Sequence, residues 1–317
     1  MLKKLIYFFL FALITACNHP GGELLFIEPE ETDAFQFPYF LFIPKGVATD
    51  EKSFVLIEPN NSGFADDDLL NHIEKAKRTA TNDYYLGNYI ARKLNCPLLV
   101  PVFPRSKTNW KIYTHALDRD VMLQEEQPLK RIDLQLIEMY RHAQNQLNNK
   151  GIASHEQFLL TGFSASGTFA NRFSLLHPDR VRAVAAGGIN GLLMLPENSL
   201  EEEILNYPIG TSDMEAITGN AFQKEIFIKT PQFYFMGQLD DNDAVPYDDA
   251  FSQAEREQIF NLLGEQMLPE RWNNCSRLYQ NAGVKARIRQ YEGIGHKHPE
   301  EVKDDVVAFF MEVVDVN

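Results

Sequence analysis

The chain has 317 residues and a formal net charge of -14, because 44 aspartates and glutamates outnumber 30 lysines and arginines. So acidic a surface repels phosphate backbones, which excludes nucleic acids as expected partners. The length suits a single large α/β domain, and no internal repeat or low-complexity linker divides it. Three cysteines are too few for a disulfide framework, so Cys96 and Cys275 are expected either to pair once or to stay as buried thiols.

The first 16 residues have the features of a secretory signal peptide. Lys3 and Lys4 precede a short apolar run, and small residues lead up to Cys17. Residues 13–17, LITAC, resemble the lipobox of bacterial lipoproteins, in which the signal is removed and the cysteine is lipidated. This resemblance implies that Cys17 becomes the first mature residue and anchors the protein through acyl chains. The alternative is a plain secreted protein that is cut nearby.

Three parts are therefore expected: a signal peptide over 1–16, a lipidated tether over 17–23 and a folded domain over 24–317. The expected location is the bacterial cell envelope, with the domain in the periplasm or at the cell surface. An outer-membrane anchor is favoured, because Asn18 is not the aspartate that often retains lipoproteins at the inner membrane. The membrane is then a partner through Cys17 alone, since no later run is apolar for long enough to span it.

From residue 24 onward, short apolar runs alternate with amphipathic stretches, which is typical of a mostly parallel sheet with helices on both faces. Eight strands are predicted, the first two as an antiparallel pair: 24–27, 37–43, 54–57, 98–102, 158–160, 181–185, 232–236 and 286–291. Helical spacing of apolar residues predicts helices over 128–147, 168–176 and 300–313, and a helix-like stretch opens at 66–68.

A long irregular segment, 191–229, interrupts this rhythm between two consecutive strands. Long insertions after the carboxyl ends of parallel strands lie over the ligand crevice, so the segment is predicted to form a lid that shapes a substrate pocket. The alternative is a packing excursion without substrate contact.

Ser164 lies between a predicted strand and a predicted helix. A serine on such a sharp corner has a strained backbone, which only small residues two positions away can tolerate. Gly162 and Ser166 are those residues, although the usual pattern G-x-S-x-G has a glycine where Ser166 stands. The corner would present the hydroxyl as a nucleophile and the amide of Ala165 as an oxyanion donor. Taken alone, the pentapeptide is equally consistent with an ordinary strand-turn-helix joint.

Two aspartates follow the predicted strand 232–236. Asp240 and Asp243 can each accept a hydrogen bond from a histidine ring and so fix its tautomer. The spacing after Gly237 favours Asp240, and Asp243 is the alternative acid. A calcium loop is disfavoured, because the segment lacks that loop's central glycine and terminal glutamate.

His296 lies in a glycine-flanked loop after the last predicted strand, where a general base is expected. His298 completes an H-x-H pair, but no third ligand is evident in the sequence, so no metal site is predicted.

The chain order Ser164, Asp240, His296, each at a predicted strand end, resembles the α/β-hydrolase superfamily. Among its branches the chain is similar to secreted bacterial esterases of the polyhydroxybutyrate depolymerase, feruloyl esterase and dienelactone hydrolase type, over nearly all of residues 24–317. The resemblance implies a second oxyanion amide in the loop 58–63, at Asn61 or at Asn60.

The same resemblance implies a serine hydrolase that cleaves small or polymeric carboxylic esters through an acyl-enzyme intermediate, with no metal or organic cofactor. Two alternatives stay open. One is a serine peptidase or amidase, which the same three residues support. The other is a binding lipoprotein that has lost activity on a hydrolase scaffold.

Overall fold

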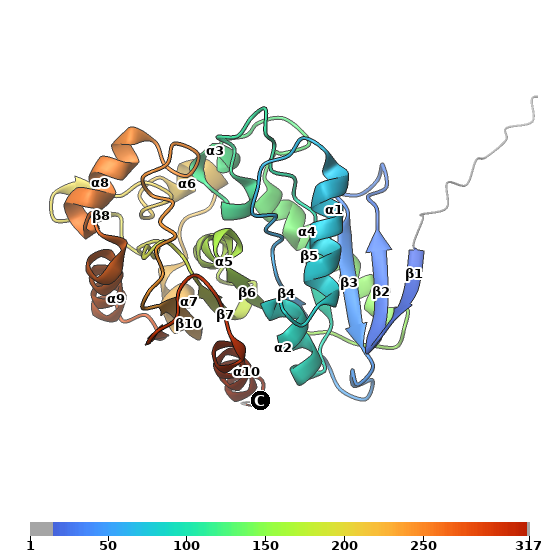
Figure 1. The fold of residues 1–317 in the computed structure, drawn as a ribbon. Coiled ribbons are helices and arrows are strands. Elements are labelled where there is room, and N and C mark those ends of the chain that lie inside the picture. The colour runs from blue at the N-terminus through green and yellow to red at the C-terminus, as the bar shows by residue number, and fades with distance from the viewer. Residues whose placement is uncertain (1–14, 316–317) are drawn as a thin grey trace, which may run out of the picture.

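The computed structural model describes residues 15–315, so most of the predicted signal peptide lies outside the described residues. Within them, nine strands form one sheet in the order β1-β2-β3-β5-β4-β6-β7-β10-β11 (Figure 1). Neighbours pair in parallel from β5 to β11, whereas β1, β2 and β3 add an antiparallel edge. The strands are β1 (Thr15–His19), β2 (Gly22–Ile27), β3 (Tyr39–Pro44), β4 (Leu56–Ile57), β5 (Leu98–Pro101), β6 (Phe158–Phe163), β7 (Val181–Gly187), β10 (Gln232–Gly237) and β11 (Ala286–Tyr291).

The mostly parallel sheet is confirmed, and all eight predicted strands belong to it. The ninth strand, β1, comes from residues assigned to the signal and the tether. Residues 17–23 lie in a hairpin rather than in a free tether, because β1 pairs antiparallel with β2 and places Cys17 opposite Leu24. Pro20 and Gly21 make the turn between β1 and β2, where Gly21 has a φ of 93°.

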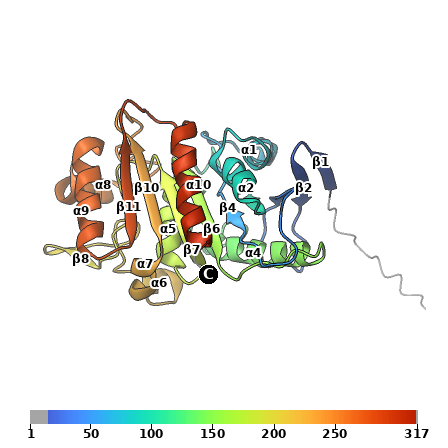
Figure 2. The same cartoon turned by 90° about the horizontal axis from the view of Figure 1, so that it is seen from below.

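Helices cover both faces of the sheet, as Figure 2 shows. On one face lie α1 (Leu69–Thr81), α2 (Leu86–Leu94) and α10 (Glu300–Val314). On the other face lie α4 (Ile132–Asn148), α5 (Ala165–Leu176), α8 (Gln253–Leu263) and α9 (Trp272–Asn281). Alternate strand residues supply the two cores, since Leu24 packs with the first set and Leu25 with the second. No helix of residues 15–315 is long and apolar enough to cross a membrane.

Shorter elements complete the chain: the helices α3 (Arg119–Met122), α6 (Met214–Thr218) and α7 (Lys224–Lys229), the 3₁₀ helix η1 (Thr114–Ala116), the π-helix η2 (Met267–Arg271), and the hairpin β8 (Ser199–Leu200) and β9 (Glu203–Ile204). The long predicted helices are present with shifted starts. The helix predicted over 128–147 begins at Ile132, and the one predicted over 168–176 begins at Ala165. The polar stretch at 66–68 ends in Asp68, whose carboxylate accepts a hydrogen bond from the amide of Leu70 and caps α1.

Cys96 and Cys275 are free thiols, both buried. Cys96 packs among the side chains under α2, and Cys275 belongs to the core on the opposite face of the sheet. Of the two states left open by the sequence, the structure has the buried thiols.

The segment 191–229 packs as part of the core. Its apolar run Leu192–Leu195 is buried on the α5 side of the sheet. The amide of Met194 donates to Asn171 Oδ1 at 2.9 Å, and the hydroxyl of Tyr279 donates to the carbonyl of Met194 at 2.7 Å. The segment is therefore held between α5 and α9. This matches the alternative of a packing excursion, and the prediction of a lid is wrong.

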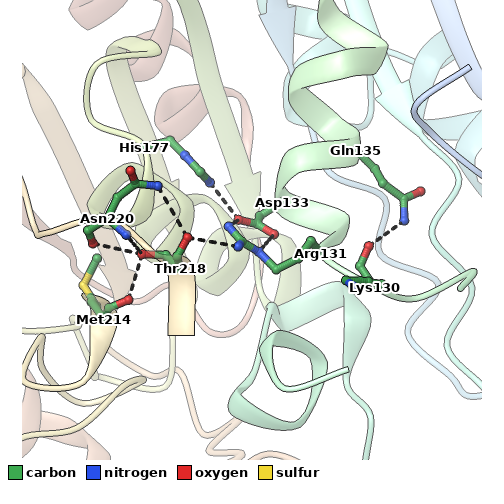
Figure 3. Close-up of polar contacts among 8 residues, drawn as sticks. All are labelled: Lys130, Arg131, Asp133, Gln135, His177, Met214, Thr218 and Asn220. Carbon is green, nitrogen blue, oxygen red and sulfur yellow. Dashed lines mark hydrogen bonds and ion pairs between the residues drawn. The ribbon is translucent and has the colours of Figure 1, made fainter. Parts of the chain in front are cut away.

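A buried carboxylate joins α4 to α5 and to the end of α6, as Figure 3 shows. Asp133 accepts hydrogen bonds from Arg131 at 2.8 and 2.9 Å and from His177 Nε2 at 2.8 Å. Arg131 also donates to the carbonyl of Thr218 at 3.3 Å. Burial acts to raise the pKa of Asp133, but the hydrogen bonds from His177 and Arg131 outweigh it and lower the pKa to about 2. This network ties the segment 191–229 to the body of the fold at Thr218.

Candidate active site

Ser164 stands at the corner between β6 and α5. Its φ is 62° and its ψ is -129°, a conformation that is rare for a residue with a side chain. The amide of Ser164 donates to the carbonyl of Gly187 at the end of β7, at 2.9 Å. Such strain persists only where the surrounding structure over-determines it, and it is common at functional sites. The strained corner predicted from the sequence is present.

Small neighbours are required at this corner for a steric reason. A Cβ on Gly162 would lie 2.3 Å from the carbonyl oxygen of Ser166, and a Cβ on Gly167 would lie 2.6 Å from that of Gly187. The hydroxyl of Ser166 donates to the carbonyl of Phe163 at 2.9 Å and accepts from its amide at 3.0 Å. The serine that replaces the usual glycine therefore ties the turn to the end of β6.

His296 and Asp240 meet beyond the ends of β11 and β10. His296 Nδ1 lies 3.0 and 2.9 Å from the two carboxylate oxygens of Asp240, whose side chain is buried. Asp243 instead pairs with Arg271 at 2.9 Å. Of the two aspartates considered, Asp240 is thus the one that contacts the histidine. This contact favours the tautomer with the proton on Nδ1, which leaves Nε2 as an acceptor.

Asn242, which sequence reasoning did not single out, faces that acceptor. Its amide nitrogen lies 3.3 Å from His296 Nε2. With Nδ1 protonated, Nε2 accepts a hydrogen bond from Asn242, so this amide has to give way before Nε2 can take a proton from a serine. The imidazole ring also packs on Phe163, with ring centroids 4.7 Å apart.

The two asparagines considered as oxyanion donors, both in the loop after β4, have different surroundings. Asn60 is buried, and its side chain bonds the amide and the carbonyl of Phe103, each at 2.9 Å. Asn61 lines the hollow at Ser164. Ala165 is the first residue of α5, so its amide is one of the first-turn N–H groups without a partner inside the helix. Asn61 and Ala165 are therefore placed beside the serine, while Asn60 secures the loop.

One hollow of about 380 Å³ contains both Ser164 and His296. One part of its wall comes from α1 and the turn before α2, with Lys75, Tyr84 and Tyr85. No described residue of the segment 191–229 lines it. This size is within the range of small-molecule sites in proteins.

Glu58 is a second lining residue that the sequence did not single out. It directly follows β4 and is buried, and its Oε2 accepts a hydrogen bond from the amide of Gly87 in the first turn of α2, at 2.6 Å. Burial raises the pKa of Glu58 to about 8, although the Gly87 hydrogen bond and the charge of Lys75 act to lower it. The carboxyl is then largely neutral at pH 7. The sequence signal that could have identified Glu58 as a site residue is its position directly after a fully apolar strand.

His298 packs against Phe163 and Tyr84, with ring centroids 4.7 and 5.4 Å away. Burial lowers its pKa to about 4, so the ring is neutral at pH 7. Among residues 15–315 no three histidine, cysteine or acidic side chains cluster in a way that could hold a metal ion.

No protein-family model matches the chain, and no curated protein sequence matches it. Solved structures do match. A poly(aspartic acid) hydrolase from Sphingomonas sp. KT-1 is similar with a TM-score of 0.58 at 14% identity, over 93% of this chain and 99% of that chain. A poly(3-hydroxybutyrate) depolymerase from Bordetella parapertussis is similar with a TM-score of 0.54 at 17% identity, over 94% of both chains. An S-formylglutathione hydrolase from Agrobacterium tumefaciens gives 0.51 at 12% identity, over 96% and 99%.

At these identities the likeness is one of fold. The chain has the α/β-hydrolase fold, and the predicted resemblance to structures of the polyhydroxybutyrate depolymerase type is confirmed at that level.

We expect Glu58 to make the free energy of unfolding fall as pH rises. The unfolded carboxyl ionises near 4.5 and the folded one near 8, so the folded state binds more protons in between. The contribution of the group is intact below pH 4.5 and is lost toward pH 8, at up to about 1.4 kcal/mol per pH unit. Glu58→Gln keeps an oxygen for Gly87 and should gain stability over the wild type as pH rises, measured by urea unfolding.

The matched control is Glu51→Gln, because Glu51 is exposed. Its stability difference from the wild type should not change with pH. A pH-independent difference for Glu58→Gln as well would contradict a neutral Glu58 in the folded protein.

Proposed function

We propose that this protein is a serine hydrolase that cleaves carboxylic esters through an acyl-enzyme intermediate. The observation that carries the proposal is the strained corner at Ser164, which opens into the same hollow as His296, itself hydrogen bonded to Asp240. A nucleophile, a base and a carboxylate that orients the base are the three parts that such chemistry needs.

The reaction follows from the roles of these groups. His296 Nε2 takes the proton of the Ser164 hydroxyl as Oγ attacks the ester carbonyl, and the negative charge moves to the carbonyl oxygen. The amides of Ala165 and of a residue near Asn61 stabilise that oxyanion. Collapse breaks the bond to the leaving oxygen, which receives the proton from His296 and departs as an alcohol. Water then attacks the acyl-serine by the same route and releases the acid.

The names of three similar structures support the ester class, whereas that of the poly(aspartic acid) hydrolase, whose polymer is joined by amide bonds, supports the amide class. A poly(3-hydroxybutyrate) depolymerase, an S-formylglutathione hydrolase and a ferulic acid esterase, the last with a TM-score of 0.50, share the fold at low identity. Both small and polymeric esters fit this proposal.

Replacement of the nucleophile is the primary test. Ser164→Ala should lower kcat for 4-nitrophenyl esters by about 10³-fold or more, because the acyl-enzyme can no longer form. A fluorophosphonate probe should label the wild type and spare this variant. Ser199→Ala, at an exposed position in β8, is the control and should keep both signals. Undiminished hydrolysis by folded Ser164→Ala protein would refute the proposal.

The two aspartates provide a second test. Asp240→Asn removes the acceptor that fixes the tautomer of His296 and should lower kcat by about 10³-fold to 10⁴-fold. Asp243→Asn breaks the pair with Arg271, so it should lower stability while activity per folded molecule stays within about tenfold. Kinetics and urea unfolding of both variants separate these effects. The reverse pattern would assign the acid to Asp243.

The lipid anchor is a further part of the proposal. A cut before Cys17 would leave only residues 17–19 of β1 on the mature protein. We expect the wild type, expressed in bacteria, to incorporate labelled palmitate and to enter the detergent phase. Cys17→Ser should do neither, and Cys96→Ser, which alters a buried thiol, should behave as the wild type. Palmitate in the Cys17→Ser protein would exclude this anchor.

A further inference from the structure

The hollow at Ser164 has a wall that the hydrolytic mechanism does not use. Lys75 and Thr79 come from α1, and Tyr84 and Tyr85 come from the turn that leads into α2. Lys75 is half-buried, and its ammonium lies 5.1 Å from the centroid of the Tyr85 ring. This wall therefore offers one cation beside flat aromatic surfaces in the same hollow as Ser164.

Lys75 makes no ion pair with a carboxylate within residues 15–315. Of the residues 15–315, Glu58 alone lines the hollow with a carboxyl, and burial keeps its pKa at about 8, so it supplies little negative charge at pH 7. Lys297, next to His296, adds a second cation to the lining. A protein with a net charge of -14 thus has a cationic hollow at its candidate nucleophile.

An ammonium without a carboxylate partner gains more from an anion in a partly enclosed site than at an exposed position, because the effective dielectric constant is lower there. The aromatic side chains beside Lys75 suit a flat apolar group next to the anion. The volume of about 380 Å³ restricts the group to a small one.

We propose that the substrate is an ester that carries a carboxylate, and that Lys75 binds this carboxylate while Ser164 attacks the ester carbonyl. This inference rests on the proposed function, since it names the substrate class of the same site. Lys75 acts as a specificity-determining residue, and Lys297 supports the positive potential around it.

Two pairs of para-substituted aryl esters test the inference, and in each pair one ester carries a carboxylate where the other carries a neutral group. On the alcohol side, 4-carboxyphenyl acetate is compared with methyl 4-acetoxybenzoate. On the acyl side, the mono-4-nitrophenyl ester of terephthalic acid is compared with 4-nitrophenyl 4-methylbenzoate. The rigid para position keeps the carboxylate away from its own ester bond. In at least one pair, the wild type should prefer the charged ester by about tenfold in kcat/KM, mainly through KM.

The variants assign that preference to a residue. Lys75→Met should abolish it, and Lys75→Arg should retain most of it, which also shows that α1 still folds. Lys77→Met is the matched control, because Lys77 lies on the same helix but is exposed and does not line the hollow. Added salt should reduce the preference of the wild type and of Lys77→Met.

The two ways to fail are distinguishable. Ester hydrolysis that survives Ser164→Ala would overturn the proposed function. Ser164-dependent hydrolysis with no preference for either charged ester, or with the same preference in Lys75→Met, would overturn the inference about Lys75 alone. Calorimetry with terephthalate and folded Ser164→Ala protein gives a readout without turnover, and we expect binding that Lys75→Met in the same background weakens about tenfold.

Discussion

Close backbone packing between α5 and the ends of β6 and β7 is the constraint on which the candidate site depends. Gly162 and Gly167 leave no room for a Cβ against the carbonyls of Ser166 and Gly187. The amide of Ser164 bonds that same Gly187 carbonyl, which fixes the serine between the two strands. Gly188 extends the constraint to His296, because a Cβ there would lie 3.0 Å from Cε1 of His296. Close backbone contacts therefore limit where Ser164 and His296 stand.

The fold could be predicted from the sequence wherever a regular pattern of apolar residues indicated which side chains are buried. Strands such as β3 are buried along their whole length, so continuous apolar runs marked them. The prediction of a tether was wrong for a physical reason. Residues 15–19 form a strand because they pair with β2, and local composition does not indicate such pairing. The prediction of a lid was wrong because it relied on the length of the segment 191–229, whereas the apolar run Leu192–Leu195 within it is buried in the core.

The residues of the candidate site also fall into two groups, those that the sequence pattern identified and those that it did not. Ser164, Asp240 and His296 could be found because each follows a strand end, and parallel strands bring such ends to one edge of the sheet. Asn242 and Lys75 could not be found in this way. Asn242 approaches the imidazole through the shape of its loop, and Lys75 comes from a helix on the face of the sheet, where its spacing resembles that of any solvated lysine.

Burial explains how so acidic a chain can present a cationic hollow. Desolvation disfavours the charged form of any group, so it holds Glu58 protonated and His298 neutral near pH 7. Lys75 is only half-buried, and Lys297 is exposed. Because burial keeps the Glu58 carboxyl largely neutral, the ammonium groups of Lys75 and Lys297 are the charged groups that a substrate meets in the hollow. The many surface carboxylates repel an anion at long range, but salt screens them beyond about 8 Å, whereas the contact inside the hollow is screened far less. Selectivity for an anionic ester can thus be decided inside the hollow, against the sign of the net charge.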